Sequence, residues 1–392
     1  MPHLGQTEVL RNPARFKVLT CGRRWGKSAL GQIDILIAAH MEHKRCWWIA
    51  PTYQMASQLW RDLVNSVKHL AKVKINATER RIDLPKGGMI AVRSAHNPDK
   101  LRGEGLDFAI LDEAAFMPAH IWHDVIRPML ATTRGVARFL STPNGRNWFW
   151  RRHRAGFDPE ETEWQSFHFK TADSSLIDPA ELASIKSSTP EIIWNTEYEA
   201  KFIDEQGQVF RHITHAAAPA PYKDPQPGHP YVAGIDWGRN RDYTAIAVLD
   251  ASNGKMVAIE RFNQVGWQLQ RDRLAQIANK WNPQVIWAEA NSIGEPNIDA
   301  LIQGGLPVRS FYTSAKSKAP LIESLALAIE RNDITLLDDP VLLTELADYS
   351  LERLPNGGFR YGAPPAGHDD TVIATALAWY GAQFASAPFA FA

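Results

Sequence analysis

The stretch RFKVLTCGRRWGKSALGQ, residues 15–32, constrains the fold of this chain more than any other segment. An apolar run is followed by a glycine-containing turn that ends in Gly-Lys-Ser, and then by residues with helical periodicity. This order of strand, turn and helix is that of a phosphate-binding loop, in which backbone N–H groups and a helix N-terminus bind phosphate oxygens. The usual pattern, G-x-x-x-x-G-K-S/T, has glycine where this chain has Cys21. The stretch predicts a nucleotide site, with a non-enzymatic scaffold that carries a degenerate loop as an alternative.

The loop residues have distinct expected roles if a nucleotide binds. Gly26 allows the backbone to approach a phosphate closely, and Gly22 gives the turn flexibility one position later than the usual first glycine. Lys27 is expected to reach the β- and γ-phosphates, and Ser28 to hold Mg²⁺. Because a Gly-Lys-Ser triplet alone is a weak signal, the prediction needs support from other residues.

Polar residues at two further strand ends supply that support. In FAILDEAA, Asp112 and Glu113 follow an apolar run, where an ATPase needs one carboxylate for the Mg²⁺ shell and another to orient the attacking water. The same pair would suit the start of a helix, but with Lys27 upstream the catalytic interpretation is favoured. FLSTPNG places Ser141 and Thr142 at the same sheet edge, where hydroxyls can sense the γ-phosphate, although a plain turn would use the same sequence.

Apolar runs alternate with helical patterns in the first half of the chain. The runs are FKVLT, RCWWIAP, DFAILDEAA and ARFLSTPNG, and RIDLPKGGMIAVRS predicts a hairpin around Gly87 and Gly88. This alternation predicts an α/β domain with a mainly parallel sheet covered on both faces. The second half predicts three antiparallel strands within 231–264, followed by alternating helices and strands that complete a mixed sheet.

A segment rich in Pro and Ala, HAAAPAPYKDPQPGHP at 215–230, separates the two halves and predicts a linker. The chain has 392 residues, which is enough for two domains. We therefore predict an ATPase domain over 1–205 with a small lid within about 146–205, a linker over 206–230 and a second domain over 231–392.

Composition is that of an ordinary globular protein, with 45% hydrophobic and 22% charged residues and a net charge of zero. No apolar run approaches the ~18 residues that span a bilayer, and the N-terminus has no apolar signal core, so no membrane partner is expected. Two cysteines cannot form a disulfide framework, which favours a reducing cytoplasm. The neutral charge gives no support for nucleic-acid binding but leaves room for a local basic face.

Acids in the second half predict a two-metal nuclease site. Asp236 lies inside an apolar strand, VAGIDWG, where an acid is costly unless its charge is compensated, and Glu289 repeats the pattern in VIWAEA. Asp369 and Asp370 begin the last helix, although first-turn acids also suit a helix dipole. Two-metal cleavage needs carboxylates from different elements that hold two Mg²⁺ or Mn²⁺ ions. This arrangement of acids matches a ribonuclease H-like fold; Asp242 is a weaker candidate that suits a turn.

Six motifs together resemble one protein family. CGRRWGKS, LRGEGLDFAILDEAA and STPNG, in this order, resemble the ATPase motor of the large terminase subunit of tailed bacteriophages, enzymes that pump genome DNA into capsids and cut it. GIDWG, VIWAEA and GHDDTVIATALA resemble the nuclease domain of that family. The resemblance implies a P-loop (RecA/ASCE-like) ATPase domain followed by a ribonuclease H-like nuclease domain. It further implies ATP-driven translocation of double-stranded DNA coupled to endonucleolytic cutting, with ATP and Mg²⁺ in the motor and two Mg²⁺ or Mn²⁺ in the nuclease.

The resemblance also assigns residues that spacing alone does not. The family often carries arginines inside the phosphate loop and does not require its first glycine, which fits Arg23, Arg24 and Cys21. By the same resemblance, Gln6 reads adenine, and Arg102 acts in the active site of a neighbouring subunit as an arginine finger. A plain surface arginine is the alternative for Arg102.

The expected partners follow from the same resemblance. They are double-stranded DNA, a portal protein and a small terminase subunit, with a homo-oligomeric ring on the portal, in the cytoplasm of an infected bacterial host and not in the mature virion. Basic runs at 151–154 and 316–318 are candidate phosphate contacts, although such runs are usually solvated surface. A helicase-like or repair ATPase fused to a resolvase-type nuclease is the alternative, but the sequence predicts only one motor core.

Overall fold

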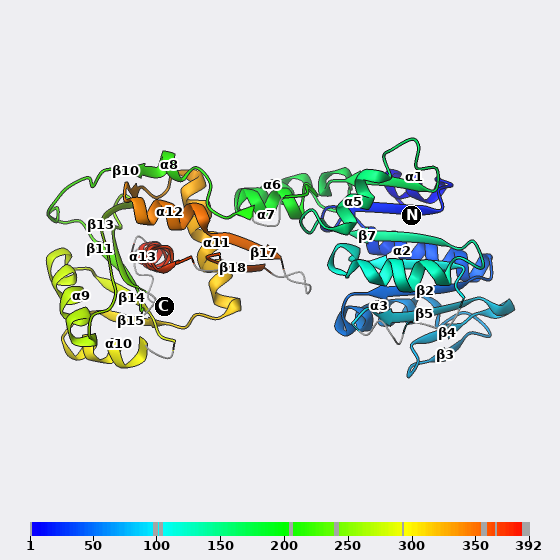
Figure 1. Cartoon of the computed structure of the whole chain (residues 1–392), viewed down its shortest axis with the longest axis horizontal. Coiled ribbons are helices and arrows are strands. Elements are labelled where there is room, and N and C mark those ends of the chain that lie inside the picture. Colours follow the sequence, from blue (N-terminus) through cyan, green and yellow to red (C-terminus); the bar gives the residue numbers. More distant parts are fainter. Residues whose placement is uncertain are drawn as a thin grey trace. The chain divides into compact units, whose positions relative to one another are not determined.

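The computed structural model describes residues 2–96, 101, 105–203, 207–238, 243–291, 294–353, 359–364 and 367–385. The chain forms two compact units (Figure 1). The first comprises Met1–Ser187, Glu191–Glu205 and Arg353–Gly358, and the second comprises Ser188–Pro190, Gln206–Glu352 and Phe359–Ala392. No helix among the described residues is both long and apolar enough to cross a bilayer.

The first unit is built on one sheet in the order β3-β4-β5-β2-β6-β7-β1-β8. The six strands from β5 to β8 in this order run parallel, and β3 and β4 continue the sheet as an antiparallel edge. The predicted hairpin and the mainly parallel sheet are therefore confirmed. The strands are β1 (Phe16–Cys21), β2 (Arg45–Ala50), β3 (Lys74–Asn76), β4 (Arg81–Asp83), β5 (Met89–Ser94), β6 (Phe108–Asp112), β7 (Val136–Ser141) and β8 (Trp164–Phe169).

Helices cover both faces of this sheet, which explains why β1 and β6 are buried along their whole length. One core packs α1 (Leu4–Arg11), α2 (Lys27–Leu36) and α3 (Tyr53–Val67) against the sheet through side chains such as Leu30 and Leu63. The other core packs the segment Ile121–Ile126 and α5 (Trp148–Ala155) through side chains such as Trp122 and Phe149. The unit also holds α4 (Arg127–Met129), α6 (Pro179–Ser187) and α7 (Glu191–Glu197).

Register places three strand ends at one edge of this sheet. β7 lies between β1 and β6, with Thr20 opposite Ser141 and Asp112 opposite Leu140. Because the three strands are parallel, the loop after β1 and the polar residues that end β6 and β7 meet at the same edge. β8 was not predicted; it comes from the region expected to form a lid, and it pairs with β1 instead.

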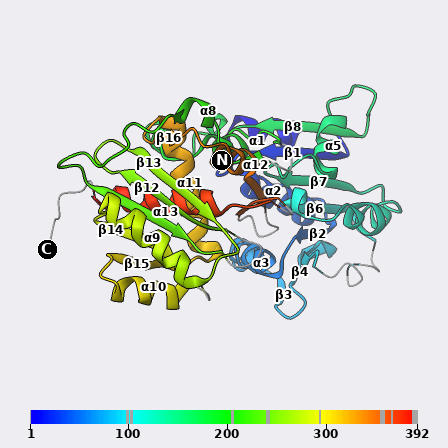
Figure 2. The ribbon, with the colours of Figure 1, turned by 60° about the vertical axis from the view of Figure 1, so that its left-hand side comes forward.

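The second unit contains the mixed sheet that the sequence predicts, in the order β13-β12-β11-β14-β15. β11 to β13 are antiparallel, and β14 and β15 run parallel to β11. The core on one face packs α9 and α10 against the sheet, and α13 lies on the opposite face (Figure 2). The elements are β11 (Tyr231–Asp236), β12 (Thr244–Asp250), β13 (Lys255–Phe262), α9 (Trp267–Trp281), β14 (Val285–Glu289), α10 (Gly294–Gln303), β15 (Val308–Phe311), α11 (Ala315–Arg331), α12 (Pro340–Asp348) and α13 (Asp370–Ala385).

α13 packs against β11 at a glycine. A Cβ on Gly234 would lie 2.1 Å from the carbonyl oxygen of Ala374 and 2.4 Å from the backbone nitrogen of Ala378, both on α13. A side chain of any size at position 234 would therefore force the helix away from the strand.

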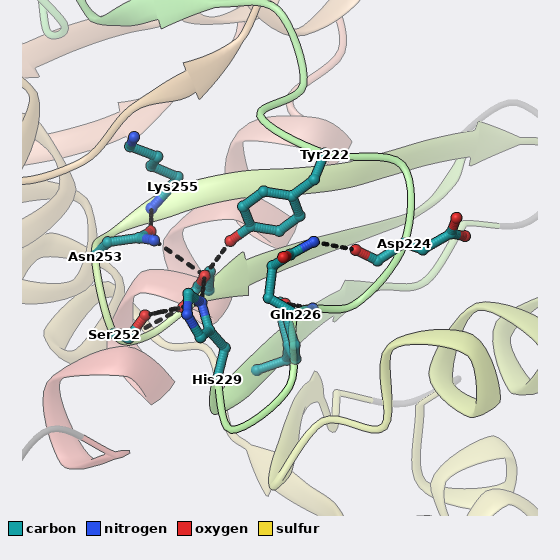
Figure 3. Close-up of polar contacts among 9 residues, drawn as sticks. Tyr222, Asp224, Gln226, His229, Ser252, Asn253 and Lys255 are labelled. Carbon is teal, nitrogen blue, oxygen red and sulfur yellow. Dashed lines mark hydrogen bonds and ion pairs between the residues drawn. The ribbon is translucent and has the colours of Figure 1, made fainter.

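The segment between the two predicted domains is packed on the second unit. β9 (Gly207–Gln208) pairs with β17 (Ser350–Arg353), next to β18 (Phe359–Gly362), and β10 (Ala217–Ala218), which follows α8 (Ile213–Ala216), pairs with β16 (Leu336–Leu337). Further along, Tyr222 and His229 converge with Ser252 and Asn253 on the buried carboxylate of Asp250 at the end of β12 (Figure 3). These contacts attach the proline-rich segment to the sheet.

Candidate functional site

The phosphate-binding loop of the first unit joins β1 to α2. Cys21 is the last residue of β1 and is fully buried, so it belongs to the strand rather than to the turn. The turn begins at Gly22, where a Cβ would lie 2.4 Å from Thr171 Oγ1 and 2.5 Å from the Tyr198 carbonyl oxygen. It ends at Gly26, whose φ of 106° is a backbone conformation that favours glycine. The glycine missing at position 21 is therefore not required by this loop.

Lys27 pairs with Glu113 at the edge where β1, β6 and β7 end. The Lys27 Nζ lies 2.9 Å from Glu113 Oε1. Glu113 Oε2 accepts hydrogen bonds from Ser141 Oγ and from the backbone nitrogen of Thr142, both at 3.2 Å. The structure thus brings together four of the predicted residues, from the loop and from two different strand ends.

Asp112 is almost fully buried behind this pair, and its carboxylate accepts from the backbone N–H of Glu113 at 3.2 Å. Burial, followed by the charge of Glu113, raises the pKa of Asp112 to about 7, although Lys27 opposes the shift. Burial tends to lower the pKa of Lys27, but the charges of Glu113 and Asp112 outweigh it and raise that pKa. Lys27 thus pairs directly with Glu113, and the charges of both carboxyl groups act on it.

The remaining predicted motor residues surround the loop. Arg23 forms an ion pair with the buried Glu197 of α7, whereas Arg24 is exposed on the loop. Ser28 is the second residue of α2 and partly buried. Gln6 is buried on α1 beside Gly26. Arg102 lies outside the described residues.

The predicted nuclease acids come from three elements of the second unit. Asp236 ends β11, Glu289 ends the adjacent parallel strand β14, and Asp369 and Asp370 stand at the start of α13. Asp236 is 7% exposed, and burial together with Glu289, and then Asp370 and Asp369, raises its pKa well above the usual value. All four predicted acids are thus close enough for the other three to act on Asp236.

Two cations that sequence reasoning did not assign to this site pair with the acids of α13. Lys318 Nζ lies 3.1 Å from an oxygen of Asp369. Arg261 Nη2 lies 3.3 Å from an oxygen of Asp370 and 2.9 Å from an oxygen of the buried Glu345. Burial and Glu345 raise the pKa of Asp370 to about 6, against the opposing charge of Arg261. No motif marks Arg261 or Glu345, because they come from β13 and α12, far from the acids in sequence.

Tyr243 completes the surroundings of Asp370. Its backbone N–H donates to Asp370 at 3.3 Å, and the centroid of its ring lies 3.5 Å from the guanidinium carbon of Arg261. Among the described residues, no group of three or more Asp, Glu, His or Cys side chains has the arrangement of a metal site. Carboxylate oxygens are nevertheless ligands that Mg²⁺ prefers, so the donor types of the four acids fit such an ion.

The two basic runs predicted as candidate phosphate contacts each combine exposed cations with a residue that contacts the protein interior or another side chain. In the run at 151–154, Arg151 and Arg154 are exposed, but His153 is buried and its Nδ1 lies 2.9 Å from Thr20 Oγ1. In the run at 316–318, Lys318 faces the carboxylate site, as described above, and Lys316 is exposed. Asp242 lies outside the described residues.

Comparison with known proteins covers both units. A family model described as "Terminase large subunit, T4likevirus-type, N-terminal" matches residues 18–214, and one described as "Terminase RNaseH-like domain" matches residues 233–379. The chain is 29% identical to the large terminase subunit of Thermus virus P23-45 over 426 residues, which cover 96% of this chain and 87% of that protein. It is 28% identical to the large subunit of Escherichia phage T5 over 214 residues, which cover 53% of this chain and 49% of that protein.

A solved structure supports the fold over the whole chain. The large terminase from a thermophilic bacteriophage, which is 15% identical, aligns with a TM-score of 0.55 over 97% of this chain and 98% of that chain. The fold is therefore an α/β unit with a mainly parallel sheet followed by a ribonuclease H-like unit. The family models span both units and together include the phosphate loop and the carboxylates of the second sheet, and the chain belongs to the terminase large subunit family.

Proposed function

We propose that this protein is the motor that packages a viral genome, using ATP to move double-stranded DNA into a capsid and a metal-dependent nuclease to cut concatemeric DNA. One observation carries the proposal: a single chain holds the Lys27–Glu113 phosphate-loop site in one unit and a carboxylate cluster around Asp236 in the other. Translocation needs the first chemistry and cutting needs the second.

In the motor, the chain supplies charge and orientation to a bound ATP. The N–H groups from Gly22 to Ser28 and the ammonium of Lys27 neutralise phosphate oxygens, which removes Lys27 from Glu113. Glu113, held by Ser141 and Thr142, then accepts a proton from the attacking water. Ser28 and Asp112 would hold the Mg²⁺ that accompanies the nucleotide, Arg23 and Arg24 would add positive charge, and Arg102 of a neighbouring subunit would stabilise the transferring phosphoryl group.

In the nuclease, Asp236, Glu289 and one or both of Asp369 and Asp370, which both lie at the site, would hold two Mg²⁺ or Mn²⁺ ions. Ions bound there would supply an activated water and charge stabilisation for the leaving oxygen of a phosphodiester. Asp236 and Glu289 hold their carboxylates at the ends of adjacent parallel strands, and α13 presents the other two. Lys318 and Arg261 balance part of the negative charge of this cluster.

The proposal extends to the organisation and partners of the protein. Residues 1–205 form the motor with its lid, 206–230 connect it to the nuclease, and 231–392 form the nuclease. The protein acts in the cytoplasm of an infected bacterium as a ring of identical subunits on the portal, together with a small terminase subunit, and is absent from the mature virion. Membership of the terminase family supports these assignments.

Paired assays of ATP hydrolysis and plasmid cleavage test the proposal. Lys27→Ala and Glu113→Ala are expected to abolish ATP hydrolysis and to keep Mn²⁺-dependent cleavage, and Asp236→Ala is expected to show the reverse. Glu181→Ala, at an exposed acid of α6, is the control and should keep both activities. A Glu113→Ala protein that hydrolyses ATP at the wild-type rate would refute the catalytic assignment.

A further inference from the structure

Arg261 of β13 lies between two acids that come from different helices. Its Nη2 is 2.9 Å from an oxygen of Glu345 on α12 and donates a hydrogen bond to Asp370 of α13 at 3.3 Å. The centroid of the Tyr243 ring lies 3.5 Å from the guanidinium carbon. The side chains of Arg261, Glu345 and Asp370 are only 18%, 7% and 9% exposed. A planar guanidinium enclosed in this way is held in one orientation.

Glu345 also contacts the first turn of α13. Its Oε2 accepts from the backbone N–H of Thr371 at 2.9 Å and from the Thr371 hydroxyl. That N–H is one of the donors at a helix N-terminus that have no partner within the helix. Because Thr371 directly follows Asp370, Glu345 holds both Arg261 and the backbone that carries Asp370.

These contacts hold the Asp370 carboxylate without using all of its acceptor sites. Its Oδ2 accepts from Arg261, and its Oδ1 accepts from the backbone N–H of Tyr243 at 3.3 Å. His368 Nδ1, at 3.8 Å from Oδ2, is beyond hydrogen-bonding distance. An ionised carboxylate has about four acceptor sites, so two hydrogen bonds leave room for a metal ion.

Arg261 and Lys318 differ in what they can contribute to the site. The charge of Arg261 is matched by Glu345, which is not one of the four predicted ligands, so this pair orients Asp370 and adds little net charge that would repel a metal ion. Among the described residues Lys318 makes one ion pair, with Asp369, and both side chains are about a quarter exposed. An ammonium on a flexible stem balances charge but fixes no orientation.

We propose that Arg261, anchored by Glu345, is a positioning residue of the nuclease. It fixes the Asp370 carboxylate in the orientation that the metal site needs, whereas Lys318 only balances charge. This inference rests on the proposed metal-dependent nuclease and deepens it. If Arg261 acted only through its charge, its removal would leave the acids more negative and would strengthen metal binding. A positioning role requires the opposite, weaker metal binding.

Binding of Mn²⁺ to the whole chain without nucleotide, followed by the EPR signal of the free ion, tests the inference without relying on cleavage. Asp236→Asn gives the binding that does not involve this cluster. We expect Arg261→Lys, which keeps the charge but loses the planar group, and Arg261→Met to raise the dissociation constant about ten- to a hundredfold, as for other residues that support metal ligands. Lys318→Met is the matched control and should bind Mn²⁺ as tightly as wild type or more tightly.

An affinity that is unchanged or higher in either Arg261 variant would overturn the inference, and so would equal weakening by Lys318→Met. Loss of a purely structural contact would lower the number of sites per chain and leave the dissociation constant unchanged, which would also overturn it. If Arg261→Met does not fold, Arg261→Lys decides alone, because it keeps the charge that pairs with Glu345. Wild-type protein that binds no more Mn²⁺ than Asp236→Asn would instead overturn the proposed metal site, and with it this inference.

Discussion

Asp236 and Asp250 are buried carboxylates on adjacent antiparallel strands, at opposite ends of the sheet of the second unit. Asp250 is surrounded by donors, from Tyr222, His229, Ser252 and Asn253. Asp236 faces other acids. Burial raises the pKa of both, but at Asp250 the hydrogen bonds outweigh burial and lower the pKa, whereas at Asp236 the neighbouring carboxylates raise it further.

This contrast separates an acid that stabilises the fold from one that needs an external partner. The protein itself supplies every compensating group around Asp250, so this carboxylate contributes to folding without a ligand. The charge of Asp236 is opposed by its surroundings and becomes favourable only when a cation arrives. Burial alone therefore does not identify a candidate functional acid. The charge of the neighbouring groups distinguishes it from a structural one.

The largest difference between the two acids is expected in DNA cleavage. Metal ions contribute several kcal/mol to such reactions, so Asp236→Asn should lower the cleavage rate by at least about a thousandfold. Asp250→Asn should stay within about threefold of wild type at a temperature where it is folded, because Asp250 lies at the other end of the sheet. Single-turnover plasmid cleavage with Mn²⁺ measures both rates, and equal losses in the two variants would contradict the assignment.

The order reverses for the stability of the metal-free protein. Asp250→Ala leaves several partly buried or exposed donors without their acceptor and, because water can satisfy some of them, should cost about 1 to 2 kcal/mol in free energy of unfolding of the second unit. Asp236→Ala removes a carboxylate that its neighbours repel and should be neutral or stabilising. Urea unfolding followed by tryptophan fluorescence, with EDTA present, distinguishes the two. If Asp236→Ala proved the more destabilising, the carboxylate cluster would be structural.

Divalent ions should stabilise the protein through Asp236 and not through Asp250. At a hundred times the dissociation constant, a ligand of the native state adds about 2.7 kcal/mol of stability. Mg²⁺ or Mn²⁺ should therefore raise the melting temperature of wild type and of Asp250→Asn, but not that of Asp236→Asn. Na⁺ at matched ionic strength controls for screening of exposed charges. A full shift in Asp236→Asn would place the stabilising ion elsewhere.

The smallest effect is the pH dependence, in which the two acids have opposite signs. Asp250 has a lowered folded pKa, so its stabilisation is present above the usual value of 3.8 and is lost as the pH falls through the folded pKa. Asp236 has a raised folded pKa, so its contribution is present below 3.8 and is lost as the pH rises toward the folded value. Each limb should slope by at most about 1.4 kcal/mol per pH unit.

Asp250→Asn and Asp236→Asn should each reduce the pH dependence of the free energy of unfolding on one side of the curve only. In EDTA, Asp250→Asn should remove part of the loss on the acidic side, and Asp236→Asn part of the loss above about pH 4, in unfolding free energies measured from about pH 3 to 7. A flattening of the same limb by both substitutions would show that the two carboxylates do not differ in the way described.

The sequence predicted strands and their polar ends well because both signals are local. Residues from the loop after β1 and the ends of β6 and β7 needed only alternating apolar runs to be placed at one sheet edge. Asp236 stood out as an acid in an apolar strand. Asp250 shares that pattern, in TAIAVLD, and was not singled out. Its donors Tyr222 and His229 come from a segment that composition predicts to be a linker, so nothing local marks the contact.

Interactions between distant segments account for the other omissions. Arg261 and Glu345 reach the surroundings of Asp370 from other elements of the chain, and no spacing rule joins them. β8 lies within 146–205, where the sequence analysis expected a lid, and pairing with β1 decides its position. The two hydrogen bonds of Gln6 join it to backbone groups, the carbonyl of Gly26 and the N–H of His3, which no side-chain pattern reveals.

Gly234 links the geometry of the second site to a single interatomic spacing. It lies two residues before Asp236 and faces the helix that starts with Asp370. The separation between the carboxylates is thus set by how closely a helix and a strand can approach, and not by loops, which are free to change in length. A methyl group added at this glycine would push α13 away from β11. Such a substitution would lie outside the carboxylate cluster and still widen the space between Asp236 and the acids at the start of α13, which we propose to hold metal ions.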